Sequence, residues 1–296
     1  MLFWRFIIGV PAILLVALLC WLDANSAIPG LYLLPGFLIC VFFICNEILD
    51  LLNSGNVFPR RSTVYLGVFS MMFLCWLACH RTFSQVADHG WDTAAVACVL
   101  TLLAMASGTI IAFLGEMARY KAPGGNTINL AGAVFIISYI GMLGCFIIML
   151  RIAYGLGAVL SLIIVTKMSD IGAYTVGKII GRRKLVPGLS PGKTIEGTIG
   201  GLFFAILGAW LTLDFIFPVF FHRTTDTSAL GLIVFGLLVG ATGIVGDLAE
   251  SLLKRDVGRK DSGRRFPGFG GFLDIFDSLL LAAPVAFGLW AFGFVK

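Results

Sequence analysis

Long apolar runs separated by short polar segments dominate the chain. Nine of them approach the roughly 20 residues that an α-helix needs to cross a bilayer core of about 30 Å. The sixth is short and is expected to continue to about Val176, and Arg151 alone separates it from the fifth. The runs lie at about 6–22, 27–45, 63–79, 93–114, 127–150, 152–166, 195–217, 228–246 and 272–295. This pattern predicts an all-α polytopic membrane protein with about nine transmembrane helices.

Composition agrees with this fold class and narrows the functional classes. Of 296 residues, 59% are hydrophobic and 12% are charged, and the mean hydropathy is +0.99, which excludes an ordinary soluble domain. The seven cysteines show no C-x-x-C spacing, so neither zinc nor a disulfide framework is indicated. Ala24-Asn25-Ser26 only weakly imitates a signal-peptidase site, and we favour an uncleaved first span over a cleaved one.

The distribution of basic residues predicts the orientation in the membrane. With the amino terminus in the cytoplasm, 17 of the 21 Lys and Arg fall on the cytoplasmic side, in the N-terminal segment and in loops 46–62, 115–126, 167–194 and 247–271. Basic residues gather on the cytoplasmic side of membrane proteins. The net charge of +5 therefore reports topology, and no nucleic-acid partner is expected.

The most polar stretch, 246–278, contains two sets of residues at helical spacing. Asp247, Glu250, Ser251 and Lys254 fall at i, i+3, i+4 and i+7, so a helix would place them on one face. Asp274 and Asp277 share a second helical face at the start of an apolar run. Carboxylates at such places are functional-site candidates because they are costly near hydrocarbon.

Loop 167–194 is the other polar stretch with a pattern. Lys167, Asp170, Tyr174 and Lys178 share a helical face, and the segment SPGKTIEG follows from Ser190 to the head of the seventh span. Gly188 to Thr194 imitates a Walker A loop, but only three residues separate its glycines and we expect no strand before it. A nucleotide site of that type is therefore rejected.

Both stretches resemble the phosphatidate cytidylyltransferases (CDP-diacylglycerol synthases). That family carries S-D-x-x-A-Y, S-P-x-K-T-x-E-G, S-x-x-K-R, K-D, P-G-H-G-G and D-R-x-D, and this chain matches most positions over its last 130 residues. The first 150 residues match only as hydrophobic spans. Phe269 stands where the family usually has His, and Ile275 where it usually has Arg. Their roles in the family cannot be carried over.

The resemblance implies transfer of the cytidylyl group from CTP to phosphatidate in the membrane, at a site on the cytoplasmic face. It implies Mg2+ held by Asp247, Asp274 and Asp277, and it allows a second cation. The catalytic residues would be these three with Lys254, Lys260 and Asp261. The substrate-binding residues would be Lys167, Asp170, Ser190, Lys193, Thr194, Glu196, Ser251 and Arg255. The catalytic region would be 151–296, after N-terminal spans in 1–150; a homodimer and a bacterial inner membrane are the expected setting.

The sequence pattern is also shared by other classes of protein. Topology and attraction to lipid headgroups account for the basic residues Arg182, Arg183, Lys184, Arg264 and Arg265 without any catalytic role. A polyprenol kinase, a CDP-archaeol-type synthase and a divergent member with altered lipid choice would share much of the pattern. A transporter would be expected to carry internal repeats and polar residues at mid-span, which this sequence lacks.

Overall fold

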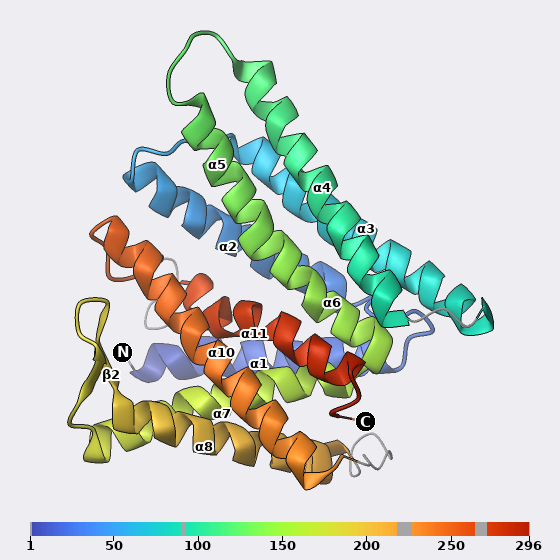
Figure 1. The fold of residues 1–296 in the computed structure, drawn as a ribbon, viewed down its shortest axis with the longest axis vertical. Coiled ribbons are helices and arrows are strands. Elements are labelled where there is room, and N and C mark those ends of the chain that lie inside the picture. Colours follow the sequence, from blue (N-terminus) through green and yellow to red (C-terminus); the bar gives the residue numbers. More distant parts are fainter. Residues whose placement is uncertain (1, 90–92, 218–226, 264–270, 296) are drawn as a thin grey trace. The chain divides into compact units, whose positions relative to one another are not determined.

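A computed structural model of the protein describes residues 2–89, 93–217, 227–263 and 271–295; the side chains of 2–10, 12, 13, 81–89, 93–98, 100 and 101 are not described (Figure 1). Most of these residues are helical. The α-helices are α1 Leu2–Ala24, α2 Leu33–Ser54, α3 Arg61–His89, α4 Thr93–Arg119, α5 Asn126–Ile136, α6 Leu143–Tyr154, α7 Leu156–Ile180, α8 Ile195–Trp210, α10 Ala229–Asp256 and α11 Leu273–Ala291. The π-helices η1 Ile137–Met142 and η2 Leu211–Ile216 continue α5 and α8.

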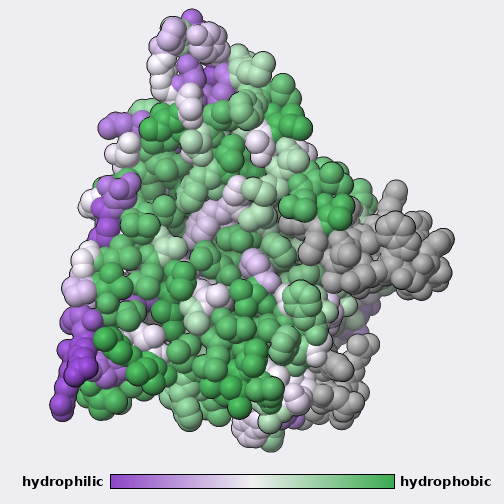
Figure 2. All heavy atoms as spheres, in the orientation of Figure 1, coloured by the Kyte–Doolittle hydropathy of each residue, from purple (hydrophilic) through white to green (hydrophobic). Residues whose placement is uncertain are grey.

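Eight helical segments of the described residues are long and apolar enough to cross a bilayer. They are Leu33–Ser54, Arg61–His80, Leu102–Arg119, Asn126–Tyr154, Leu156–Ile180, Ile195–Ile216, Ala229–Asp256 and Leu273–Ala291. A shorter apolar segment, Leu14–Ala24, belongs to α1. Apolar residues cover most of the surface visible in Figure 2, as expected of helices that face lipid. The polytopic helical architecture is confirmed, whereas the count of nine stays a prediction.

The structure corrects two details expected from the sequence and extends a third. The break between the fifth and sixth runs lies at Gly155, whose φ of +88° suits a residue without Cβ, and not at Arg151. The sixth run, expected to continue to about Val176, is helical as far as Ile180, so the loop begins later than Lys167. A β-hairpin, β1 Lys184–Val186 paired antiparallel with β2 Ser190–Thr194, then follows. A strand therefore does precede Gly188, although the glycine spacing still excludes a Walker A loop.

The chain divides into two compact units. Unit 1 contains residues 1–153 and 256–274, and unit 2 contains residues 154–255 and 275–296. The first division falls between Ala153 and Tyr154. Segment 256–274, however, belongs with the N-terminal helices, so the polar stretch 246–278 supplies residues to both units.

The core of unit 1 is built from packed apolar helices. Helix α3 packs against α4 and η1, and α2 packs against α3, α5 and η1. Ile44, Met71 and Ile137, from α2, α3 and η1, have no exposed surface or almost none. Such close packing transmits the position of each helix to its neighbours.

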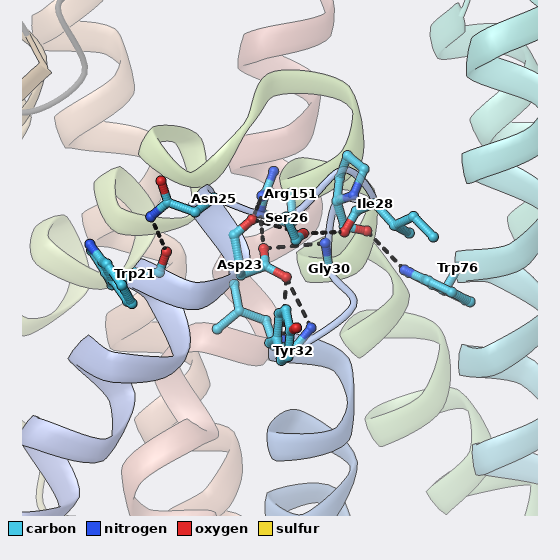
Figure 3. A network of polar contacts seen from close by, with 11 residues as sticks. Trp21, Asp23, Asn25, Ser26, Ile28, Gly30, Tyr32, Trp76 and Arg151 are labelled. Atoms are coloured by element: carbon cyan, nitrogen blue, oxygen red, sulfur yellow. Dashed lines mark hydrogen bonds and ion pairs between the residues drawn. The ribbon is translucent and has the colours of Figure 1, made fainter.

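A buried ion pair connects helices α1 and α6 of unit 1 (Figure 3). Asp23 at the end of α1 is fully buried, and its Oδ2 lies 2.6 Å from Nε of Arg151 on α6. The same carboxylate accepts hydrogen bonds from the backbone N–H groups of Gly30 at 3.2 Å and Tyr32 at 3.1 Å. A buried carboxylate needs partners of this kind because it has lost its hydration. The network fixes the connection between α1 and α2 to the end of α6.

Small residues bring the helices of unit 2 close together. Added Cβ atoms at Gly172 of α7 and Gly200 of α8 would clash with Phe204 and Val176 of the facing helix. Gly240 of α10 approaches Ala205 of α8 in the same way. Close approach through small side chains is typical of helix pairs in membranes, where apolar surface alone gives little driving force.

Candidate active site

Three carboxylates gather in unit 2. Asp247 and Glu250 lie on α10 and Asp277 lies on α11, and each offers an oxygen within 4.8 Å of the oxygens of the other two. Glu250 and Asp277 are almost fully buried, at 1% and 4% exposure. The i, i+3 spacing of Asp247 and Glu250 places both on one face of α10, as expected from the sequence.

Glycine brings α10 and α11 together at this cluster. A Cβ on Gly246 would lie 2.5 Å from the backbone oxygen of Asp277, so a larger residue would push the two helices apart. Ser278 then orients the carboxylate of Asp277, because its backbone N–H and its hydroxyl donate to Asp277 Oδ1 at 2.6 and 2.9 Å. The cluster is thus positioned by backbone contact as well as by its own side chains.

Two lysines flank the cluster. Nζ of Lys193, on β2, lies 2.8 Å from Oδ2 of Asp247 and donates to the backbone oxygen of Ile244 at 3.3 Å. Nζ of Lys254, on α10, lies 2.8 Å from Oε2 of Glu250. Lys254 is the more buried of the two, with 11% of its side chain exposed against 21% for Lys193.

The hairpin that carries Lys193 is anchored at both ends. Oε2 of Glu196 accepts the backbone N–H groups of Arg182 at 3.0 Å and Arg183 at 3.2 Å, just before β1. Oγ1 of Thr194 accepts the N–H of Gly197 at 3.1 Å and caps α8. Both residues were predicted to bind substrate, and in this structure their contacts hold the hairpin. Arg255 adds a hydrogen bond from Nε to the backbone oxygen of Leu189 at 3.3 Å.

Asp274, the third predicted metal ligand, belongs to unit 1 and has partners there. Its Oδ2 lies 2.6 Å from the backbone nitrogen of Gly271, which donates to it, and 2.9 Å from the hydroxyl of Ser262. Residue 274 lies in the first turn of α11, where backbone N–H groups lack helical partners and a carboxylate stabilises the helix end.

Glu47 is a functional candidate that the sequence analysis missed. This buried residue of α2 accepts the backbone N–H groups of Phe272 and Leu273, both at 2.9 Å, and Oε2 lies 3.2 Å from the hydroxyl of Ser262. A Cβ on Gly271 would clash with the Glu47 carboxylate and the Ser262 hydroxyl. The sequence analysis placed Glu47 in a loop just after the second apolar run, whereas it lies inside helix α2, where a carboxylate is costly near hydrocarbon.

The remaining predicted site residues occupy varied positions. Lys167 forms an ion pair with Asp170 at 3.1 Å, one turn apart on α7. Ser251 is buried on α10, Ser190 is half-buried on β2, and Lys260 and Asp261 are exposed in the segment after α10. Ile275, which departs from the family pattern, is exposed on α11. Phe269 lies outside the described residues, as do Arg264, Arg265, Pro267, Gly268 and Gly270.

The donor set defines what the cluster could bind. Three carboxylates and neither Cys nor His offer the hard oxygen ligands that Mg2+ prefers. The adjacent lysines offer the ammonium donors suited to phosphate oxygens. The residues therefore fit a divalent cation bound together with a phosphorylated substrate.

Fold and site together define an integral membrane protein with an acidic cluster flanked by lysines. The chain belongs to the cytidylyltransferase family, whose family model matches residues 4–292 and so extends the likeness seen in the last 130 residues to nearly the whole chain.

Relatives with curated names agree with this family. A phosphatidate cytidylyltransferase of Mycobacterium leprae is 33% identical over 249 residues, which cover 83% of this chain and 75% of that protein. A phosphatidate cytidylyltransferase of Haemophilus influenzae is 44% identical over 133 residues, 44% of each chain. An uncharacterized Escherichia coli protein, YnbB, is 43% identical over 129 residues, 44% of this chain and 41% of that protein. The chain thus spans less than half the length of the last two relatives.

Proposed function

We propose that this protein transfers the cytidylyl group of CTP to phosphatidate, producing CDP-diacylglycerol and pyrophosphate for phospholipid synthesis. The carboxylate cluster of Asp247, Glu250 and Asp277 with Lys193 and Lys254 beside it carries the proposal. Membership of the cytidylyltransferase family and the names of two relatives support the choice of substrates.

The reaction places simple demands on the chain. A phosphate oxygen of phosphatidate attacks the α-phosphorus of CTP, and the bond from that phosphorus to the bridging oxygen of the β-phosphate breaks. The nucleophile is already anionic at neutral pH, so no strong general base is needed. The site must bring two anions together and stabilise the charge that develops on pyrophosphate.

The residues of unit 2 meet these demands in distinct ways. Asp247, Glu250 and Asp277 would hold Mg2+, which when bound neutralises phosphate oxygens and stabilises the leaving pyrophosphate. Lys193 and Lys254, each 2.8 Å from a cluster carboxylate, would donate to the phosphates. Ser190 shares a strand with Lys193. The roles predicted from the sequence for Asp274, Lys260 and Asp261 stay predictions, as does a second cation.

The setting is also part of the proposal. The amino terminus, hairpin 184–194 and segment 257–263 would face the cytoplasm of a bacterial cell, where CTP is available, and the protein would reside in the inner membrane. Support comes from the excess of Lys and Arg on that side.

The position of a radioactive label in CTP, together with the choice of lipid, distinguishes this function from those of a polyprenol kinase and a CDP-archaeol-type synthase. Purified protein with phosphatidate and Mg2+ should move label from the α-phosphate of CTP into the lipid, and label from the β- or γ-phosphate into pyrophosphate. A polyprenol kinase would instead move γ-label into a polyprenol, and a CDP-archaeol-type synthase would prefer an ether lipid. Absence of α-label in any lipid, with Mg2+ present, would overturn the proposal.

A further inference from the structure

We propose that Lys193 and Lys254 are exchangeable counter-ions: they neutralise the cluster before it binds a divalent cation, and they turn to the nucleotide phosphates once it does. This inference rests on the proposed function, because it assumes that Asp247, Glu250 and Asp277 hold the cation. It adds a second role for Lys193, predicted to bind substrate, and for Lys254, predicted to be catalytic.

The contacts of the two lysines support this exchange. Each ammonium group lies 2.8 Å from an oxygen of a cluster carboxylate, Lys193 on Asp247 and Lys254 on Glu250. The three cluster oxygens lie within 4.8 Å of one another, so these lysines occupy the space around the position that a cation would take. Three carboxylates so close together need positive charge beside them, since like charges at this distance repel strongly.

Binding of a divalent cation reverses this balance. The three carboxylates carry three negative charges, and the two ammonium groups reduce the net charge of the cluster to one negative charge. A bound divalent cation would change this net charge to one positive charge. The ammonium groups are then repelled by the cation, and the triphosphate of CTP offers them new oxygen partners. Each lysine side chain has a flexible four-carbon stem, so it can change partners by rotation without backbone movement.

The two lysines should differ in how easily they exchange. Lys193 lies on the hairpin, and its side chain is more exposed than that of Lys254. Its ammonium group donates to the backbone oxygen of Ile244 as well as to Asp247. Lys254 is largely buried beside Glu250, whose side chain is also buried. We therefore expect Lys193 to leave first, and it is the better residue for a test.

Binding of Mn2+, a spectroscopic substitute for Mg2+, provides the first test, in the absence of nucleotide. Because a competing cation is removed, Lys193→Met should bind Mn2+ about three- to fivefold more tightly by electron paramagnetic resonance, in line with a partly exposed ion pair. Lys193→Arg keeps the charge and should retain the wild-type affinity. Lys178→Met removes a lysine that stacks on Tyr174, 5.6 Å from its ring centre, and should change nothing.

Chemical modification provides a second readout that does not depend on any variant. Acylation of lysines by an N-hydroxysuccinimide ester, followed by mass spectrometry, should label Lys193 faster when Mg2+ is added, while labelling of Lys178 should stay constant. A weaker or unchanged affinity of Lys193→Met for Mn2+, or absence of Mn2+ binding by the wild type, would overturn the exchange. So would labelling of Lys193 that Mg2+ does not increase.

These outcomes are separable from failure of the proposed function. Should the wild-type protein show the metal-linked changes at Lys193 but form no labelled CDP-diacylglycerol, the exchange would stand and the reaction assignment would fall. Should product form while Lys193→Met binds Mn2+ no more tightly, the reaction would stand and the exchange would fall.

Discussion

Asp274 has structural contacts at a helix end and, in our prediction, a second role in binding Mg2+. Its Oδ2 accepts from the backbone N–H of Gly271 and lies beside the hydroxyl of Ser262, both in unit 1. These contacts require an acceptor oxygen but not a negative charge, whereas binding of Mg2+ requires the charge as well. Substitution by Asn separates the two requirements.

We expect Asp274→Asn to lose more than about tenfold in turnover at saturating Mg2+, because an amide oxygen is a far weaker ligand for a divalent cation. The helix end should survive, since the amide oxygen can still accept both contacts. Product formation and thermal stability in detergent would be measured together. Asp214→Asn, at an exposed carboxylate on η2, is the matched control and should alter neither. Turnover of Asp274→Asn close to the wild-type value would contradict the assignment.

Single residues differ in how well their roles could be predicted from the sequence. Glu250 shares a face with Asp247 by local spacing, so the sequence placed it near the cluster even though it was not selected as a ligand. The partners of Glu47 are Ser262, Phe272 and Leu273, more than 200 residues away, and no local pattern could connect them. Asp23 and Arg151 are likewise 128 residues apart, and each looks like an isolated charge at the end of an apolar run.

At the scale of elements, hydrophobic length predicted the membrane helices well because each span must satisfy its own backbone within the hydrocarbon. The spacing of Lys167, Asp170, Tyr174 and Lys178 also indicated a helix, and α7 does continue to Ile180. The hairpin 184–194 was missed because its strands are short and contain Pro and Gly, which normally indicate loops. The hairpin is stabilised by the hydrogen bonds that Glu196 and Thr194 accept at its two ends.

The crossing of α10 and α11 depends on the absence of a side chain at one position. We expect Gly246→Ala to lower turnover at least tenfold and to cost about 1–3 kcal/mol in the free energy of unfolding, since the added methyl group would meet the backbone of Asp277. Gly288→Ala on α11 is the matched control, because its Cβ would only reach ordinary contact distance, 3.9 Å from Phe292. Equal activity of the two variants would show that α10 and α11 need not approach so closely.

At the scale of the whole chain, the polar stretch 246–278 does not form one continuous site segment. Asp247, Lys254 and Asp277 belong to unit 2, whereas Lys260, Asp261 and Asp274 belong to unit 1. The residues that match the family signature are therefore close in sequence but divided between the two units. Sequence proximity predicted a common function for these residues but could not predict that the chain changes units at Arg255 and again at Asp274.

Membrane topology is the prediction that concerns the entire molecule. With 17 of the 21 Lys and Arg on one side, hairpin 184–194 should face the cytoplasm and the connection between α1 and α2 the opposite side. Position 188 suits a cysteine probe because nothing lies within 4 Å of an added Cβ there. Position 263, in segment 257–263, is unsuitable, since a Cβ would lie 2.6 Å from Oε1 of Glu47.

Gly188→Cys and Ala27→Cys would be placed separately in a variant cleared of its seven native cysteines, and both positions are exposed. A membrane-impermeant maleimide applied to the outer side of the inner membrane should label Cys at position 27 and spare position 188. Inverted inner-membrane vesicles should give the reverse pattern, which controls for the intrinsic reactivity of each thiol. Labelling of position 188 from the outer side would place the hairpin, and with it Lys193 and its partner Asp247, away from the cytoplasmic supply of CTP.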